Sequence, residues 1–127
     1  PVLPVAGTLV KGKDKTVWFV DSHGRRRGFV SGKHFGELGF SFGRVQVISD
    51  TDLALIPPAN PIEDHEGHPD GAIIKCGNSA AVFQVIGNSK FPFSRGEAFT
   101  VRGNAFEHVL TVDCGKFKYV LGAAVNP

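Results

Sequence analysis

Residues 63–70 gather side chains of the kinds that bind metal ions. Four carboxylates and two imidazoles fall in this stretch: Glu63, Asp64, His65, Glu66, His68 and Asp70. Carboxylate oxygens and imidazole nitrogens are ligands for Zn²⁺ and other divalent ions. No helical or strand pattern fixes their geometry, so we interpret the stretch as a solvated acidic connector without a metal. If a metal site exists there, its expected ligands are Asp64, His65 and His68.

Three consecutive arginines, Arg25, Arg26 and Arg27, form the second candidate site, with Trp18 nearby in a VWFV run. Guanidinium groups donate paired hydrogen bonds to carboxylates, sulfates or sugar hydroxyls. An aromatic ring stacks on the apolar face of a sugar. We therefore predict a ligand site at Trp18, Arg25, Arg26 and Arg27. Two alternatives stay open: the arginines protect the edge of a solvated strand, and Trp18 packs in the core.

The chain has two cysteines, Cys76 and Cys114, which lie 38 residues apart and form no CxxC motif. In a secreted protein such a pair forms a disulfide. The alternative is two free, buried thiols in a cytosolic protein. We predict the disulfide.

The sequence shows no constellation typical of an enzyme. Its serines lack the G-x-S-x-G context. A Cys–His pair with His108 would need free thiols, which a disulfide excludes. We therefore expect a protein without catalytic activity or a cofactor, and a small hydrolase is the alternative.

Composition indicates a globular, β-rich chain. Of its 127 residues, 42% are hydrophobic and 20% charged, and the 11 Phe fall with Val, Ile and Leu in short apolar runs. Such runs, separated by Gly and Pro, are typical of strands and turns. No run approaches the roughly 20 residues that span a bilayer. A net charge of +2 is too small for a dedicated nucleic-acid binder.

Residues 24–48 return in altered form at residues 87–112, which predicts two copies of one unit. The copies align at a constant offset of 64 through Phe29 and Phe93, Phe35 and Phe99, Gly39 and Gly103, Phe42 and Phe106, and Val45 and Val109. We predict repeat unit 1 at 1–62, the acidic connector at 63–70 and repeat unit 2 at 71–127.

Each repeat is expected to contain short antiparallel strands and one short helix. The predicted fold is mainly β, a β-rich α+β class, with both pseudo-symmetric repeats packed as one compact domain. Ser31 and Ser94 are the expected helix N-caps, and Ser49 or Asp50 is expected to cap a one-turn helix that ends near Leu55. We expect Phe35, Phe42, Phe99 and Phe106 in a shared core. The predicted strands are Thr8–Lys11, Val17–Val20, Arg26–Val30, Val45–Ile48, Ala72–Lys75, Val82–Val85, Lys90–Phe93, Val109–Val112 and Gly115–Leu121.

These motifs resemble a repeat found in secreted and cell-surface bacterial proteins, in which a segment like "GkkRpFpSaevFealGydw..V" follows a strand of the "VYLV" type. The resemblance rests on Gly24, Arg25, Arg26, Arg27, Phe29, Ser31, Phe35, Gly39, Phe42 and Val45, and in the second copy on Lys90, Pro92, Phe93, Ser94, Phe99, Gly103, Phe106 and Val109. It implies tandem non-catalytic modules. Gly28, the cysteine pair and the acidic connector depart from the pattern.

From these observations we expect a secreted or cell-surface binding module for a carbohydrate or another cell-wall or surface ligand. We interpret the chain as a mature protein or a fragment, because it starts at Pro1 without a signal-peptide pattern. The expected partner is a glycan or a surface protein, with no nucleic acid and no membrane span, and a homodimer stays open. The alternative function is a protein-binding inhibitor or a toxin-like interaction protein.

Overall fold

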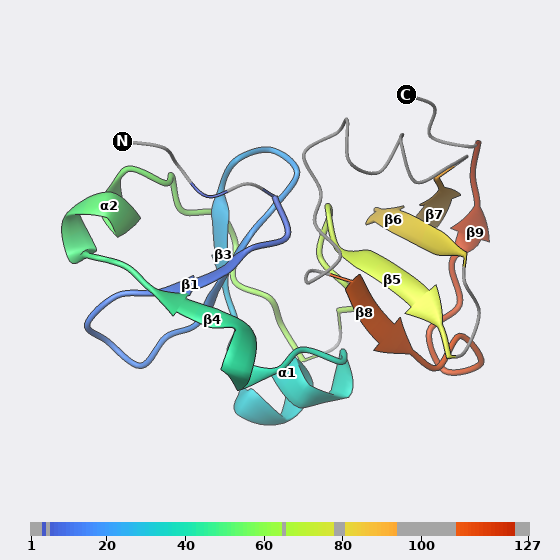
Figure 1. Ribbon diagram of the computed structural model, residues 1–127, viewed down its shortest axis with the longest axis horizontal. Coiled ribbons are helices and arrows are strands. Elements are labelled where there is room, and N and C mark those ends of the chain that lie inside the picture. The colour runs from blue at the N-terminus through green and yellow to red at the C-terminus, as the bar shows by residue number, and fades with distance from the viewer. Residues whose placement is uncertain (1–3, 5, 65, 78–80, 94–108, 124–127) are drawn as a thin grey trace. The chain divides into compact units, whose positions relative to one another are not determined.

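The computed structural model describes residues 4, 6–64, 66–77, 81–93 and 109–123, which fall into two compact units, unit 1 (Pro1–Glu66) and unit 2 (Gly67–Pro127) (Figure 1). The division lies inside the predicted connector. The described residues form nine strands in two sheets and only short helices, so the predicted mainly β, α+β class is confirmed. The second predicted helix, from Ser94 to Gly103, lies outside the described residues. No helix in the described part of the chain is long and apolar enough to cross a membrane.

Unit 1 contains a four-stranded sheet with the order β3-β2-β1-β4. Its two hairpin pairs, β1–β2 and β2–β3, are antiparallel, whereas β4 pairs parallel to β1. The sheet is therefore mixed, where the sequence pattern predicted antiparallel strands. The chain reaches β4 through a helix, and such a crossover brings a strand back in the parallel direction. The strands are β1 (Leu9–Lys11), β2 (Trp18–Val20), β3 (Arg26–Gly28) and β4 (Val45–Val47).

Short helices follow β3 and β4, and a serine caps each of them. In α1 (Gly32–Glu37) the Ser31 hydroxyl accepts a hydrogen bond from the His34 backbone N–H at 3.1 Å, as predicted. Ser49 caps α2 (Asp50–Ala54) in the same way, and Ser41 caps the 3₁₀ turn η1 (Phe42–Arg44). These caps satisfy N–H groups that have no partner inside a helix. Helices of this length are unstable alone and depend on tertiary packing.

The outer edge of β3 is covered by residues 57–62, the first part of a stretch that we call the edge segment (described residues 57–64 and 66). Arg26 N–H donates to the Pro57 carbonyl at 2.8 Å, and Ala59 N–H donates to the Arg26 carbonyl at 2.9 Å. Further along, Ile62 N–H donates to the Gly28 carbonyl at 2.7 Å, and the Ile62 side chain is buried. The first part of this Pro-rich, acidic stretch therefore completes the sheet of unit 1.

Unit 2 contains a five-stranded sheet with the order β8-β5-β6-β7-β9. Its hairpin pairs β5–β6 and β6–β7 are antiparallel, while β8 and β9 add in parallel to β5 and β7. Of the predicted strand Gly115–Leu121, only the last two residues are a strand, because Asp113 accepts hydrogen bonds that form a turn at Gly115. The strands are β5 (Ile73–Cys76), β6 (Val82–Ile86), β7 (Ser89–Pro92), β8 (Val109–Val112) and β9 (Val120–Leu121).

Aromatic rings form much of the core of unit 1. Phe35 is only 1% exposed and contacts the rings of Phe29, Phe40 and Phe42. The predicted core position of Phe35 is confirmed. For Phe42 the prediction is wrong, because this ring is 63% exposed. The second pair of rings in the expected shared core, Phe99 and Phe106, lies outside the described residues.

The predicted disulfide is confirmed: Cys76 at the end of β5 is bonded to Cys114, which follows β8. The two Cα atoms are 5.4 Å apart, and the bond closes a loop between residues 38 positions apart. In the chain-entropy model, a loop of that length stabilises a fold by about 4 kcal/mol, because it restricts the unfolded chain. Unit 2 therefore carries a covalent link between two neighbouring parallel strands.

We expect the double substitution Cys76→Ser with Cys114→Ser to destabilise unit 2 by about 4 kcal/mol. Native-state hydrogen exchange measures this change residue by residue. Amides of β5 and β6 should exchange faster, while amides of β1 and β2 in unit 1 serve as the internal control. Unchanged protection of β5 and β6 would contradict the structural role of the bond. Two alkylatable thiols in the unreduced wild-type protein would contradict the bond itself.

Candidate binding site

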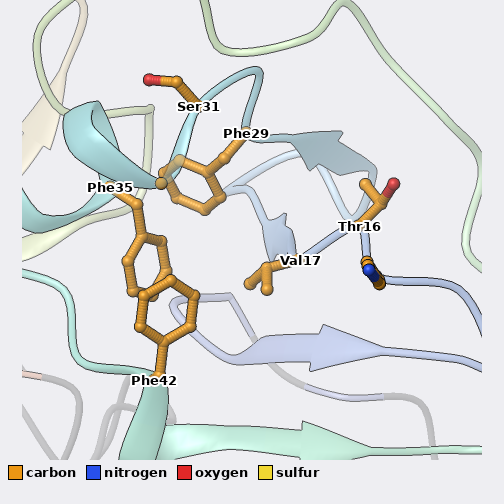
Figure 2. Close-up of a pocket in the computed structure, with 8 residues that line it drawn as sticks. Thr16, Val17, Phe29, Ser31, Phe35 and Phe42 are labelled. Carbon is orange, nitrogen blue, oxygen red and sulfur yellow. The ribbon is translucent and has the colours of Figure 1, made fainter.

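Unit 1 has a half-open pocket of about 190 Å³ beside its aromatic core (Figure 2). Its walls come from the loop before β2, the residues that follow β3, the first turns of α1, and η1. All of these elements belong to one compact unit. The lining residues are Lys15, Thr16, Val17, Phe29, Ser31, Gly32, Phe35 and Phe42.

Three phenylalanine rings form the apolar side of the pocket. Phe42 stacks on Phe35 with ring centroids 4.4 Å apart and an angle of 27° between the ring planes. Phe29 contacts Phe35 edge-on, with centroids 4.9 Å apart and an angle of 85°. Figure 2 shows the rings of Phe35 and Phe42 lying one over the other, with Val17 beside them. Stacked and edge-on arrangements are both favourable for aromatic pairs, so the rings hold one another in place.

The exposure of the stacked pair is unequal. Phe35 is buried, whereas Phe42 has one face against Phe35 and remains largely open to solvent. Ser41 and Gly43 account for this position, because the Ser41 hydroxyl accepts from the Gly43 N–H at 3.2 Å and so fixes the turn that carries Phe42. An exposed large aromatic ring at the mouth of a pocket is a feature typical of ligand sites.

The polar groups of the pocket differ in their contacts: Ser31 is hydrogen-bonded within the protein, whereas Lys15 and Thr16 are exposed to solvent. The Ser31 hydroxyl accepts from the His34 N–H and donates to Oδ1 of Asp64 at 2.7 Å. Lys15 and Thr16 are exposed and precede β2. The eight lining residues include no carboxylate, imidazole or thiol. The pocket is therefore suited to binding a small ring with an apolar face, and its lining offers no nucleophile paired with a base.

The structure brings together two of the four residues predicted as a ligand site. The Arg26 guanidinium lies over the Trp18 ring, 4.3 Å from its centroid, and Arg26 Nε donates to the Ile56 carbonyl at 2.8 Å. Trp18 itself packs against a buried cluster that contains Val10 and Ile56. This cation–π pair is thus attached to the unit's own core and backbone.

The other two arginines point to other partners. Arg27 follows Arg26 on the same strand, so its side chain lies on the opposite face. Its guanidinium donates to the Asn60 carbonyl and pairs with Glu66 at 2.8 Å. Arg25 is half exposed and lies 3.9 Å from the buried carboxylate of Asp21. Ligand binding by Trp18, Arg25, Arg26 and Arg27 stays a prediction, and the phenylalanine pocket is a separate candidate.

The residues named as possible metal ligands have protein partners where they are described. Asp64 accepts from Ser31, and Nδ1 of the buried His68 lies 2.6 Å from the Tyr119 hydroxyl. His65 lies outside the described residues. Within the described part of the chain, no three His, Cys, Asp or Glu side chains gather as metal ligands would.

Comparisons with protein-family models, with curated proteins and with solved structures found no match to this chain. The candidate site therefore rests on its geometry. Sequence reasoning missed it because Phe29, Phe35 and Phe42 have the spacing and composition of core residues. The Ser41-Phe42-Gly43 turn was the available indication, since a capped turn at the surface exposes the residue within it.

Tyr119 in unit 2 has a pH dependence that follows from its contacts. Burial raises the pKa of its hydroxyl above the ordinary value of 10.0, while the His68 backbone N–H, which donates to that oxygen, has the smaller, opposite effect. The unfolded chain therefore loses this proton at a lower pH than the folded chain. The stability that this group contributes is complete below pH 10 and is lost as pH rises through the folded-state pKa.

We expect the absorbance titration of the native protein to place the ionisation of tyrosine above that of the urea-unfolded protein. Tyr119 is the chain's only tyrosine, so the phenolate signal is unambiguous. In parallel, the free energy of unfolding should fall above pH 10 more steeply for the wild type than for Tyr119→Phe. Equal titration midpoints in native and unfolded protein would show that the hydroxyl is not desolvated.

Proposed function

We propose that this protein is a non-catalytic carbohydrate-binding module, and that one sugar ring docks in the pocket of Phe29, Phe35 and Phe42. The observation that carries this proposal is the exposed Phe42 ring, held on the buried Phe35 at the mouth of the pocket. Aromatic faces stack on the apolar C–H face of a pyranose, while the sugar hydroxyls remain at the edge. A rigid ring already in position loses little conformational entropy on binding.

The size of the pocket supports a ligand of about one six-membered ring. A cavity of roughly 150 Å³ holds benzene, and this pocket measures about 190 Å³. Sites for larger organic ligands usually have roughly 300–1,000 Å³. The half-open shape leaves room for the neighbouring sugars of a chain to extend into solvent. The lining without carboxylate, imidazole or thiol supports binding rather than hydrolysis.

A secreted or cell-surface location is part of the proposal. The bond between Cys76 and Cys114 supports it, because structural disulfides form in oxidising compartments. The resemblance of the two copies of the Phe-Ser-Phe-Gly-Phe pattern to repeats of secreted bacterial proteins points the same way.

We also propose that units 1 and 2 are copies of one module. Two features that occur in both sheets support this. Leu9 pairs with Val45 in unit 1, and Ile73 pairs with Val109 in unit 2, each residue 64 positions after its counterpart. In unit 1 the Ala59 N–H donates to the Arg26 carbonyl. In unit 2 the Gly122 N–H, just after β9, donates to the carbonyl of Lys90, which is 64 positions after Arg26.

Binding of a protein partner is the second candidate function, and the exposed edge of β4 favours it. Among the described strands of unit 1, β4 ends the sheet, and Val47 on it is 71% exposed. An extended peptide adds to such an edge through backbone hydrogen bonds. Val47→Lys separates the two functions, because it should weaken an edge-bound protein and leave glycan binding unchanged.

We expect wild-type protein to bind members of a glycan array and Phe42→Ala to lose about tenfold in affinity for them. The reason is the loss of ring stacking, worth about 0.5–1.5 kcal/mol, together with the lost apolar contact area. Phe42→Trp should retain binding because it preserves an aromatic face. Leu55→Ala is the matched control, since Leu55 is also an exposed apolar residue of unit 1 but does not line the pocket.

The measurement after the array is titration calorimetry or NMR with the glycan that binds most tightly. Circular dichroism of each variant checks that the fold is retained. Binding that is unaffected by Phe42→Ala, or no glycan bound by the wild type, would contradict the proposal.

A further inference from the structure

We propose that the sugar bound in this pocket is anionic, with a carboxylate or sulfate at the edge of its ring, and that Lys15 binds that group and determines the specificity. This inference rests on the proposed carbohydrate-binding function. It concerns which sugars the pocket selects, and its first support is the charge of the lining. Lys15 is the one ionisable side chain among the eight lining residues.

Three of the other cations in unit 1, the consecutive arginines, already have partners within the unit. Arg25 lies beside Asp21, Arg26 lies over Trp18, and Arg27 pairs with Glu66. No described residue forms an ion pair with Lys15, which is exposed at the rim. An ammonium group on a flexible stem can follow an anion at the ring edge and donate up to three hydrogen bonds to it.

The neighbouring acidic groups, Asp14 and Asp64, do not line the pocket. Asp64 is bound to the Ser31 hydroxyl and is not a lining residue. Asp14 precedes Lys15 in an exposed turn and also lies outside the lining. Lys33, in the first turn of α1 next to the lining residue Gly32, adds a second positive charge near the site.

The chemistry of an anionic sugar matches a pocket with phenylalanine rings on one side and Lys15 and Thr16 on the other. In a uronic acid or a sulfated sugar, the charged group projects from the edge of the ring and leaves one C–H face apolar. That face can lie against Phe42 while the charge reaches Lys15 and a ring hydroxyl reaches Thr16. A neutral sugar fills the same aromatic site but leaves the ammonium without an anion. The expected preference for the anionic form is therefore about tenfold, the effect of one charge-assisted hydrogen bond.

The test compares matched pairs of glycans with wild-type protein by titration at low and high salt. Each uronic-acid oligosaccharide is paired with its methyl ester, and each sulfated oligosaccharide with its desulfated form. The charged member of a pair should bind about tenfold more tightly than its neutral counterpart. If the uronic-acid pair shows this preference, the group is a carboxylate; if the sulfated pair shows it, the group is a sulfate. The preference should shrink in high salt, because the site is exposed to solvent.

Substitutions of Lys15 test whether this residue causes the preference for the charged glycan. Lys15→Gln should reduce it to less than about twofold while binding of the neutral glycan persists, and Lys15→Arg should retain most of it. Lys13→Gln is the matched control, because Lys13 is an exposed lysine of the same turn that does not line the pocket.

The outcomes separate this inference from the function on which it rests. Equal affinity for charged and neutral members of every pair overturns the inference and leaves carbohydrate binding standing. A charge preference that survives Lys15→Gln overturns the role of Lys15. No binding of any glycan by the wild type overturns both proposals.

Discussion

The packing of Phe35 is the interaction on which the candidate site depends. Helix α1 has six residues and cannot persist without tertiary contacts. Phe35 supplies those contacts, since its buried ring touches Phe29, Phe40 and Phe42. Burial of a phenylalanine stabilises a fold by about 1.5–3 kcal/mol. The same ring also positions Phe42 at the pocket mouth, so one side chain serves both the core and the site.

The edge segment is the second constraint on unit 1, and it gives the arginines a structural role. Arg26 donates to the carbonyls of Ile56, just before this segment, and of Pro57, its first residue. Arg27 binds Asn60 and Glu66 within the segment. The segment in turn contacts α1 twice, because Asp64 accepts from Ser31 and the Glu66 carbonyl lies 2.7 Å from His34 Nε2. Strand β3 thus has no open edge along these residues, which removes a place where another chain could pair. The hydrogen bonds of the edge segment therefore both cover the edge of β3 and fix the position of α1.

Local chemistry in the sequence predicted much of the fold, and long-range contacts account for what it did not predict. Ser31 was predicted as a cap, and Ser49 as one of two candidates beside Asp50, because capping depends on near neighbours in sequence. The disulfide followed from the count and spacing of cysteines. The pairing of residues 57–62 with β3 was not predicted, because three prolines resemble a connector and their partners lie about 30 positions away. The exposure of Phe42 was also missed, since hydrophobicity alone cannot distinguish a core ring from one stacked on the outside of the core.

The most direct test of the account is an NMR titration with the best glycan from the array, using protein with ¹³C-labelled phenylalanine rings. Trp18, the chain's only tryptophan, provides a separate reporter through its indole N–H. The account predicts that signals of Phe42 and Phe35 shift with ligand while the indole signal of Trp18 stays in place. Movement of the Trp18 signal with unchanged phenylalanine signals would contradict it and would place the ligand beside Trp18 and Arg26 instead.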